Sequence, residues 1–439
     1  MRKSDFGALR IYPGRGAGSA PVLLCCRVIS HGDVMSSAER RPGVLSLVPD
    51  IWGAGSWMPR HQVLTRLSAY FPVTWMDPPE QWRRLWTGTA RPRPSETGLP
   101  EDSDFQVYRP GRLLPRVFRP TVAARLTEKG RLRAASRLLA QRGAEPAVLY
   151  LWRPQFAPVL DLLPDCVSVY HVDDEYSFST TEQPVDPNEA ALLGRASQCI
   201  IHSPALWEKK AHLASRAALI PNGVDYTAYA TPVAEPADLQ SIPHPRIGYI
   251  GVIKSQLDMP LLLALAERRP DWSFVLVGRC RPGEDQEAFN ALSQLPNVHL
   301  LGQRPIAALP SYTQHFDVGL MPYDVNDYTK YIYPLKLHEY LATGLPVVAS
   351  GIRTLLDFSS VVSIADSVDE WASAIEASLA PGARSPEMVA ERRSVARGHD
   401  WNVLVARIAA LIAERLGSSW PELVAAKAEA EANLQGALS

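Results

Sequence analysis

The sequence lacks the cysteine patterns that mark secreted or zinc-stabilised proteins. Five cysteines occur in 439 residues, with no Cys-x-x-Cys pair and no histidine at zinc-finger spacing. They are Cys25, Cys26, Cys166, Cys199 and Cys280. Such a pattern favours a reducing, cytoplasmic setting over a secreted one.

Long apolar runs and excess charge are also missing. No stretch of 18 or more apolar residues is present, which excludes an ordinary membrane-spanning helix. The formal net charge of −1 argues against a dedicated nucleic-acid binder, so no nucleic-acid partner is expected. A hydrophobic content of 46% in a chain of this length is enough for two domains with separate cores.

Predicted strands alternate with helices along most of the chain, which indicates an α/β fold of two Rossmann-like domains. Residues 1–40 are rich in Gly, Ser and Arg, and we expect a disordered leader there. The first domain is predicted over 41–230, a Pro-rich linker over 231–245 and the second domain over 246–415. Residues 416–439 are predicted to form a C-terminal helix that either packs back on the first domain or is a solvated tail.

The stretch from Tyr333 to Ser350 is the most informative segment. Its apolar residues recur at helical spacing, so Lys336 and Glu339 share the opposite face one turn apart. A lysine near a helix start can meet phosphate oxygens together with free backbone N–H groups, and a carboxylate can accept hydrogen bonds from two ribose hydroxyls. An ordinary Lys/Glu surface pair is the alternative interpretation.

The whole string resembles the donor-site helix of the glycosyltransferase 1 / family 4 glycosyltransferases, which have the GT-B fold. The matching residues are Pro334, Lys336, Glu339, Tyr340, Leu341, Ala342, Gly344, Pro346, Val347 and Val348. The resemblance implies two domains that face each other across a cleft and a nucleotide-diphosphate sugar as donor. It also implies that Glu339 binds the donor ribose, while Pro334, Leu335 and Lys336 hold the diphosphate.

One position departs from the family pattern. The family has a second Glu eight residues before Glu339, and Tyr331 stands there. Because that Glu is credited with a role at the transferred sugar, the donor sugar and the stereochemical course stay open. Tyr331 is retained as a candidate donor-site residue.

A second group of polar residues, Tyr170 to Glu175, follows a predicted strand. His171, Asp173 and Asp174 should lie at its carboxyl end, where a general base can deprotonate an acceptor hydroxyl. The resemblance extends to xanthan-type glucuronosyltransferases, in which an Asp four residues after a strand-end Tyr is the base, and it points to Asp174. A solvated acidic loop, a helix cap at Asp173 and a Mg²⁺ or Mn²⁺ site are the alternatives. Because the resembled enzymes work without metal, we expect no metal and no cofactor.

Further candidates follow other strands. Lys254 and Arg279 come after two strands of the second half, where a cation would neutralise the leaving diphosphate. Tyr328 and Lys330 precede the donor helix. In the first half, Gly53 and Gly55 allow close backbone approach in a predicted cleft loop, with Arg60 and His61 just beyond it, although a plain turn is equally consistent.

Residues 109–142 carry ten basic residues against one acidic residue, Glu128. Partial helical amphipathicity and this charge are typical of a peripheral membrane contact, or of a polar helix face. A membrane contact would fit a lipid-linked acceptor and a place at the inner face of the membrane.

The sequence therefore predicts a glycosyltransferase that moves a sugar from a nucleotide sugar to a glycan or lipid-linked acceptor in cell-surface polysaccharide or glycoconjugate synthesis. Two alternatives stay open. A sugar-nucleotide 2-epimerase of the same fold would turn over without an acceptor. A non-catalytic sugar-nucleotide-binding scaffold would bind donor but transfer nothing.

Overall fold

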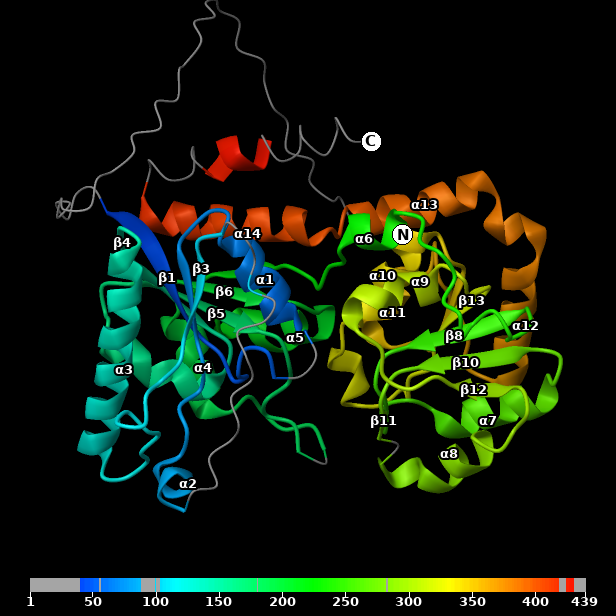
Figure 1. Ribbon diagram of the computed structural model, residues 1–439, viewed down its shortest axis with the longest axis horizontal. Coiled ribbons are helices and arrows are strands. Elements are labelled where there is room, and N and C mark those ends of the chain that lie inside the picture. Colours follow the sequence, from blue (N-terminus) through cyan, green and yellow to red (C-terminus); the bar gives the residue numbers. More distant parts are fainter. Residues whose placement is uncertain are drawn as a thin grey trace, which may run out of the picture. The chain divides into compact units, whose positions relative to one another are not determined.

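Two parallel β-sheets, each with its own helices, organise the protein (Figure 1). The computed structural model describes residues 40–54, 57–87, 99, 103–179, 181–281, 283–417 and 424–429. The predicted α/β class with two Rossmann-like domains is confirmed. The predicted leader lies almost entirely outside the described residues.

The first sheet has seven parallel strands in the order β3-β2-β1-β4-β5-β6-β7. Its strands are β1 (Arg41–Leu47), β2 (Val73–Met76), β3 (Phe105–Tyr108), β4 (Ala144–Leu151), β5 (Val167–Val172), β6 (Gln198–Ile201) and β7 (Ala217–Leu219). Apolar side chains alternate between its two faces: Val44 packs into one core cluster and Leu45 into another. A sheet buried on both faces needs helices on both sides.

The second sheet has six parallel strands in the order β12-β10-β8-β13-β14-β15. They are β8 (Arg246–Ile250), β10 (Ser273–Val277), β12 (Val298–Leu300), β13 (Val318–Met321), β14 (Val347–Ala349) and β15 (Ser363–Ile364). A separate two-residue ladder joins β9 (Ile253–Lys254) to β11 (Cys280–Arg281) just past the ends of β8 and β10.

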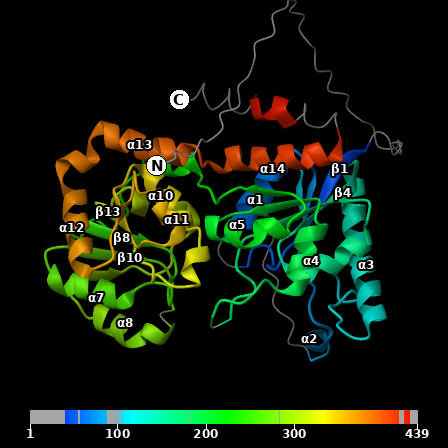
Figure 2. The same ribbon diagram turned by 180° about the vertical axis from the view of Figure 1, so that it is seen from behind.

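Helices connect the strands of both sheets (Figures 1 and 2). In the first half they are α1 (Pro59–Leu67), α2 (Trp82–Trp86), α3 (Thr121–Gln141), α4 (Pro187–Arg195) and α5 (Pro204–Lys210). In the second half they are α6 (Tyr226–Ala230), α7 (Met259–Arg268), α8 (Gln286–Leu292), α9 (Leu309–Thr313), α10 (Leu335–Thr343), α11 (Arg353–Leu356), α12 (Val368–Leu379), α13 (Pro386–Arg397) and α14 (Trp401–Leu416). Among the described residues, no helix has the length and apolar character needed to cross a bilayer.

The predicted linker, residues 231–245, is packed on the second domain. Leu239 and Ile242 are buried in the core of that domain, and Arg246 donates hydrogen bonds to both of their carbonyl oxygens at 2.8 Å. The Pro-rich composition therefore marks an irregular but buried segment. The chain leaves the first sheet earlier, in the turn that contains Asn222.

The chain returns to the first domain earlier than predicted, at Trp401. Ile408 and Ile412 of α14 are fully buried in the core cluster that also holds α1 and one face of the first sheet. Two backbone hydrogen bonds join the segment that leaves the first domain to the segment that returns to it. Val224 N donates to His399 O at 3.0 Å, and Trp401 N donates to Val224 O at 2.9 Å. Residues 424–429 are helical, and Val424 is buried in the same cluster.

If α14 holds the first domain together, truncating its buried face will destabilise the protein. We expect Ile408→Ala to lower the free energy of unfolding by about 2–5 kcal/mol, because the lost methyl groups leave a cavity. Val403→Ala is the control, since Val403 lies on the same helix with 45% of its surface exposed. Urea unfolding followed by tryptophan fluorescence measures both. Equal losses in the two variants would contradict this packing.

Candidate active site

The donor helix α10 is fixed in place by its buried face. Leu337, Tyr340 and Leu341 are fully buried, and Tyr340 Oη accepts a hydrogen bond from Ile250 N at the end of β8 at 2.9 Å. Gly344 ends the helix with φ 82°, a left-handed conformation that favours glycine. The helix start is thereby held beside the carboxyl end of β8.

Lys336 lies among tyrosine side chains near the start of α10. Its Nζ donates to Tyr323 Oη at 2.7 Å and stands 4.9 Å from the ring centroid of Tyr249. Aromatic faces attract a cation, but they carry no formal negative charge. Lys336 forms no salt bridge with any described residue, and a bound anion would be stabilised beside its ammonium.

Glycine residues, which have no side chain, lie next to the Lys336 ammonium. Gly251 has φ +133°, and a Cβ there would come within 3.4 Å of Lys336 Nζ. Gly278 packs against it so tightly that its own Cβ would lie 1.8 Å from Gly251 O. Only glycine fits at both positions, and the arrangement gives phosphate-sized groups close access to the backbone.

Other cations gather at the same strand ends. Lys254 ends β9, opposite Arg281 of β11, and Ile253 N donates to Arg279 O at 3.0 Å. Burial and the charge of Lys336 lower the pKa of Lys254. The Arg279 side chain is exposed and forms no salt bridge with any described residue. Mutual repulsion of Lys336 and Lys254 would be relieved by a bound anion.

Glu339 lies one turn after Lys336 on α10. Burial raises the pKa of its carboxyl, while nearby Lys336 and the Tyr229 hydroxyl act in the opposite direction. A buried carboxylate with spare acceptor capacity suits hydroxyl donors such as those of a ribose. Pro334 and Leu335 form the cap and first residue of the same helix.

At the end of β5, Asp173 is held by two arginines. Its carboxylate accepts from Arg60 Nη1 at 2.7 Å, from Arg153 Nη1 at 3.1 Å and from Tyr176 Oη. Burial alone would raise the pKa of Asp173, but the two guanidinium groups and Tyr176 hold it below its usual value. Arg60 is buried in this ion pair, where the sequence pointed to an open cleft loop.

Asp174, the next residue, has a different environment. Its Oδ1 accepts from Glu175 N at 2.8 Å, and it forms no salt bridge with any described residue. Burial raises the pKa of the Asp174 carboxyl, the Glu175 N–H opposes that change, and the charge of Asp173 adds to it. Of the two adjacent aspartates, Asp174 is thus the one whose raised pKa makes it the better proton acceptor.

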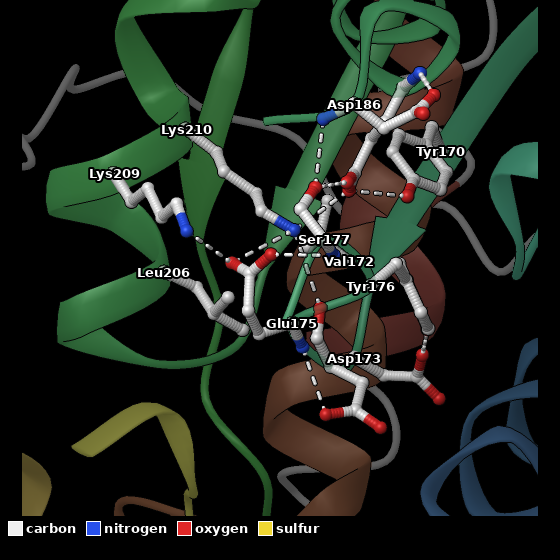
Figure 3. Close-up of polar contacts among 12 residues, drawn as sticks. Tyr170, Val172, Asp173, Glu175, Tyr176, Ser177, Asp186, Leu206, Lys209 and Lys210 are labelled. Atoms are coloured by element: carbon white, nitrogen blue, oxygen red, sulfur yellow. Dashed lines mark hydrogen bonds and ion pairs between the residues drawn. The ribbon is translucent and has the colours of Figure 1, made fainter. Parts of the chain in front are cut away.

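A buried ionic network fixes the loop that carries Asp174 (Figure 3). Lys210 Nζ lies 2.8 Å from Glu189 Oε1 and 3.3 Å from Glu175 Oε2, and all three side chains are fully buried. Tyr170 Oη donates to Glu189 Oε1 at 2.9 Å. Sequence reasoning missed this network, because nothing in the sequence links Lys210 of α5 to the strand-end carboxylates.

His171 is part of the first-domain core. Its Nδ1 lies 2.9 Å from Tyr150 Oη, and its ring stacks on Trp152 with centroids 4.2 Å apart. Burial lowers the pKa of His171 to about 3. His171 is therefore neutral and packed, at the edge of the group formed by Asp173 and Asp174.

The loop after β1 is tied into the first-domain core. Trp52 is buried, and its backbone N–H donates to Asp77 Oδ1 at 2.8 Å. Gly53 has φ 78°, which favours glycine there, and Gly55 lies outside the described residues. His61 is buried against the Trp52 ring, and burial lowers its pKa to about 4.

Tyr331 faces the first domain. It lies in the short 3₁₀ turn η6 (Thr329–Tyr331), is buried, and donates from Oη to Glu182 Oε1 at 2.5 Å. Lys330 Nζ lies 2.5 Å from the other oxygen of Glu182, and these hydrogen bonds lower the pKa of Glu182 to about 2. The ring of Tyr328 contacts Phe178 at 5.3 Å between centroids. The segment before α10 thus connects the two halves of the site.

A family model matches most of the second domain. Residues 244–380 match the family model described as Glycosyl transferases group 1. The chain carries a glycosyl transferases group 1 domain. This segment contains Lys254, Lys336 and Glu339, so the predicted resemblance is confirmed. No three His, Cys, Asp or Glu side chains in the described ranges are grouped as metal ligands would be.

The chain is also similar to TuaH of Bacillus subtilis (strain 168), whose name assigns it to teichuronic acid biosynthesis as a glycosyltransferase. The two are 33% identical over 196 residues, which is 43% of this chain and 49% of TuaH. The chain thus spans about half the length of the curated relative it matches.

Solved structures share the fold over most of the chain. Sucrose-phosphate synthase from Thermosynechococcus elongatus is 18% identical, with a TM-score of 0.61 over 84% of this chain and 97% of its own. HepE of Anabaena, solved with UDP and glucose, is 16% identical, with a TM-score of 0.58 over 84% and 98%. The predicted GT-B fold is confirmed.

The pKa of His171 makes a prediction about acid stability. Below pH 6.5 this histidine is protonated in the unfolded chain, whereas in the folded chain it stays neutral down to about pH 3. This contribution to the free energy of unfolding is therefore complete above pH 6.5 and falls by about 1.4 kcal/mol per pH unit below it. We expect His171→Gln, which keeps a partner for Tyr150, to lose about 1.4 kcal/mol less than the wild type between pH 7 and pH 5.5. Urea unfolding at both pH values measures this, and equal losses would contradict a neutral buried histidine.

Proposed function

We propose that the protein transfers a sugar from a nucleotide-diphosphate sugar to a glycan or lipid-linked acceptor. The observation that carries the proposal is the Lys336 ammonium, held by tyrosines at the start of α10 and in no salt bridge with any described residue. The glycosyl transferases group 1 family of this domain and the UDP in the HepE structure support the same donor chemistry.

On the donor side, Lys336, Lys254 and backbone N–H groups near Gly251 would offset the charge of the diphosphate as it leaves. Glu339 would accept hydrogen bonds from the ribose hydroxyls, with Pro334 and Leu335 at the helix start lining the diphosphate. Arg279 would meet the outer phosphate or the sugar. In this proposal protein cations do the work of a metal ion, and no cofactor takes part.

On the acceptor side, Asp174 would take the proton of the attacking hydroxyl. The acceptor oxygen forms a bond to the anomeric carbon while the bond from that carbon to the diphosphate oxygen breaks. Asp173 holds Arg60 and Arg153 and so positions the loop, and His171 packs behind it. A dedicated base of this kind belongs to an inverting transfer, whereas a retaining transfer leaves Asp174 without this task.

The acceptor belongs, in this proposal, to cell-surface polysaccharide or glycoconjugate synthesis, as the name of TuaH indicates for that protein. A lipid-linked acceptor would be met at the inner face of the membrane, with residues 109–142 as the contact. A 2-epimerase would instead convert its sugar nucleotide without any acceptor, and a scaffold would only bind it.

Removing the Asp174 base should slow chemistry and spare donor binding. We expect Asp174→Asn to lower kcat by about 10²–10⁴-fold with an unchanged Kd for the nucleoside diphosphate. The wild-type rate should fall as pH drops through the raised pKa of Asp174. Transfer of radiolabelled sugar, assayed with EDTA present, measures the rate. An unchanged kcat would exclude the base, and turnover without acceptor would favour the epimerase.

The donor site predicts a second pair of variants. Lys336→Met should weaken nucleoside diphosphate binding about 10–100-fold, because a hydrogen bond to a charged group contributes about 1.5–3 kcal/mol. Glu339→Gln should weaken the binding of a nucleoside diphosphate but leave the binding of inorganic pyrophosphate unchanged. Lys129→Met, on α3 of the first domain, is the matched control. Calorimetry measures all three, and unchanged affinity in Lys336→Met would place the nucleotide elsewhere.

A further inference from the structure

Large apolar side chains are exposed together at one end of the first domain. Trp86 is 87% exposed and Leu113 is 94% exposed. With four neighbours they form what we call the tip surface: Trp82, Trp86, Leu113, Phe118, Val122 and Leu126. Tryptophans are rarely left in water at this level without a partner for their apolar ring.

Hydrogen bonds hold the three segments of the tip surface together. Trp82 N donates to Arg116 O at 3.4 Å, and Arg116 N donates to Glu80 O at 2.8 Å, which joins α2 to the loop after β3. That loop is held on α3, because Arg131 Nη1 donates to Leu114 O and Pro115 O at 3.1 and 2.7 Å. In both Figures 1 and 2, α3 runs along the side of the first sheet and α2 lies near one end of α3.

Exposed cations surround these apolar side chains. They are Arg83, Arg112, Arg119, Arg125 and Lys129. Other basic residues of the predicted 109–142 patch are engaged elsewhere: Arg131 is buried, Arg142 donates to Ser103 O, and Arg109 lies 3.6 Å from Asp77 Oδ2. The structure thus removes Arg109, Arg131 and Arg142 from the predicted patch and adds α2, which the sequence gave no reason to include.

We infer that the tip surface seats the protein on an anionic lipid bilayer, with Trp82 and Trp86 at the level of the headgroups. Tryptophan favours the membrane interface because one side of the ring is apolar and its N–H is polar. The surrounding cations are attracted to anionic headgroups. Exposed aliphatic tips such as Leu113 and Val122 add apolar area that a polar protein partner or a nucleic acid would not cover.

The position of the tip surface links it to the site. α2 follows β2, and the loop with Leu113 follows β3, so both leave the carboxyl edge of the sheet at which Asp174 follows β5. This inference rests on the proposed function in one respect: it gives the acceptor a lipid anchor that approaches Asp174 from the bilayer. The bilayer contact itself is tested without donor or acceptor.

Co-sedimentation of the full chain with vesicles tests the inference. Vesicles of phosphatidylcholine mixed with phosphatidylglycerol are compared with vesicles of phosphatidylcholine alone. We expect binding to the anionic vesicles only, and its loss in Trp82→Ser/Trp86→Ser. Arg112→Gln/Arg119→Gln should weaken binding about 25-fold at low salt, since each basic residue near the surface contributes about 1 kcal/mol and 1.4 kcal/mol is a factor of ten.

The matched control is Arg133→Gln/Arg137→Gln, which removes the same charge from exposed positions further along α3. Arg133 and Arg137 lie about 12 and 18 Å along the helix axis from Arg125, so this variant should weaken binding less than Arg112→Gln/Arg119→Gln does. Equal weakening by both arginine pairs would overturn the tip surface in favour of unspecific attraction. Absence of vesicle binding by a wild type that binds nucleoside diphosphate would overturn the bilayer contact and leave the proposed function standing. A dimer in sedimentation velocity that Trp82→Ser/Trp86→Ser dissociates, with no vesicle binding, would assign the surface to a second copy.

Discussion

The buried carboxylate of Asp173, shared between two arginines, organises the acceptor side of the site. Arg60 comes from the helix after β1, Arg153 follows β4 and Asp173 follows β5, so one ionic cluster ties three neighbouring strand ends together. Removing one partner of such a cluster costs about 3–5 kcal/mol, because the others stay buried and unpaired. The guanidinium groups hold the pKa of Asp173 below its usual value, whereas burial and the negative charge of Asp173 raise the pKa of Asp174. Two adjacent residues of the same type thus acquire different chemistry from their surroundings.

The proposed donor side differs, since the half-buried Lys336 ammonium forms no salt bridge with any described residue. The rings of Tyr249 and Tyr323 stabilise the Lys336 ammonium but do not neutralise its charge. Lys254 adds a second positive charge nearby. An anionic ligand would relieve the repulsion between Lys336 and Lys254. This repulsion, present in the free protein, would therefore favour the binding of a diphosphate. Tyr331 and Lys330 then connect the donor helix to Glu182 of the first domain, which brings the two halves of the site into register.

Strongly apolar strands and the donor helix were predictable from local sequence. Helix α10 carries Lys336 and Glu339 on one face, as predicted, because helical spacing is a local pattern. The edge strand β3 was not predicted, since only its first and last residues are buried. The return of α14, the burial of the 231–245 segment and the pairing of Arg60 with Asp173 depend on contacts between distant residues. No local pattern encodes such contacts. The position of the exposed Trp86 beside the α3 arginines also depends on contacts between distant residues.

A crystal structure of the complex with a nucleoside diphosphate sugar would test the central claim most directly, which is that Lys336 and Asp174 belong to one active site. The account predicts diphosphate oxygens within hydrogen-bond distance of Lys336 Nζ, ribose hydroxyls on Glu339, and the anomeric carbon turned toward Asp174. A nucleotide bound away from the start of α10, or a sugar directed away from Asp174, would contradict it.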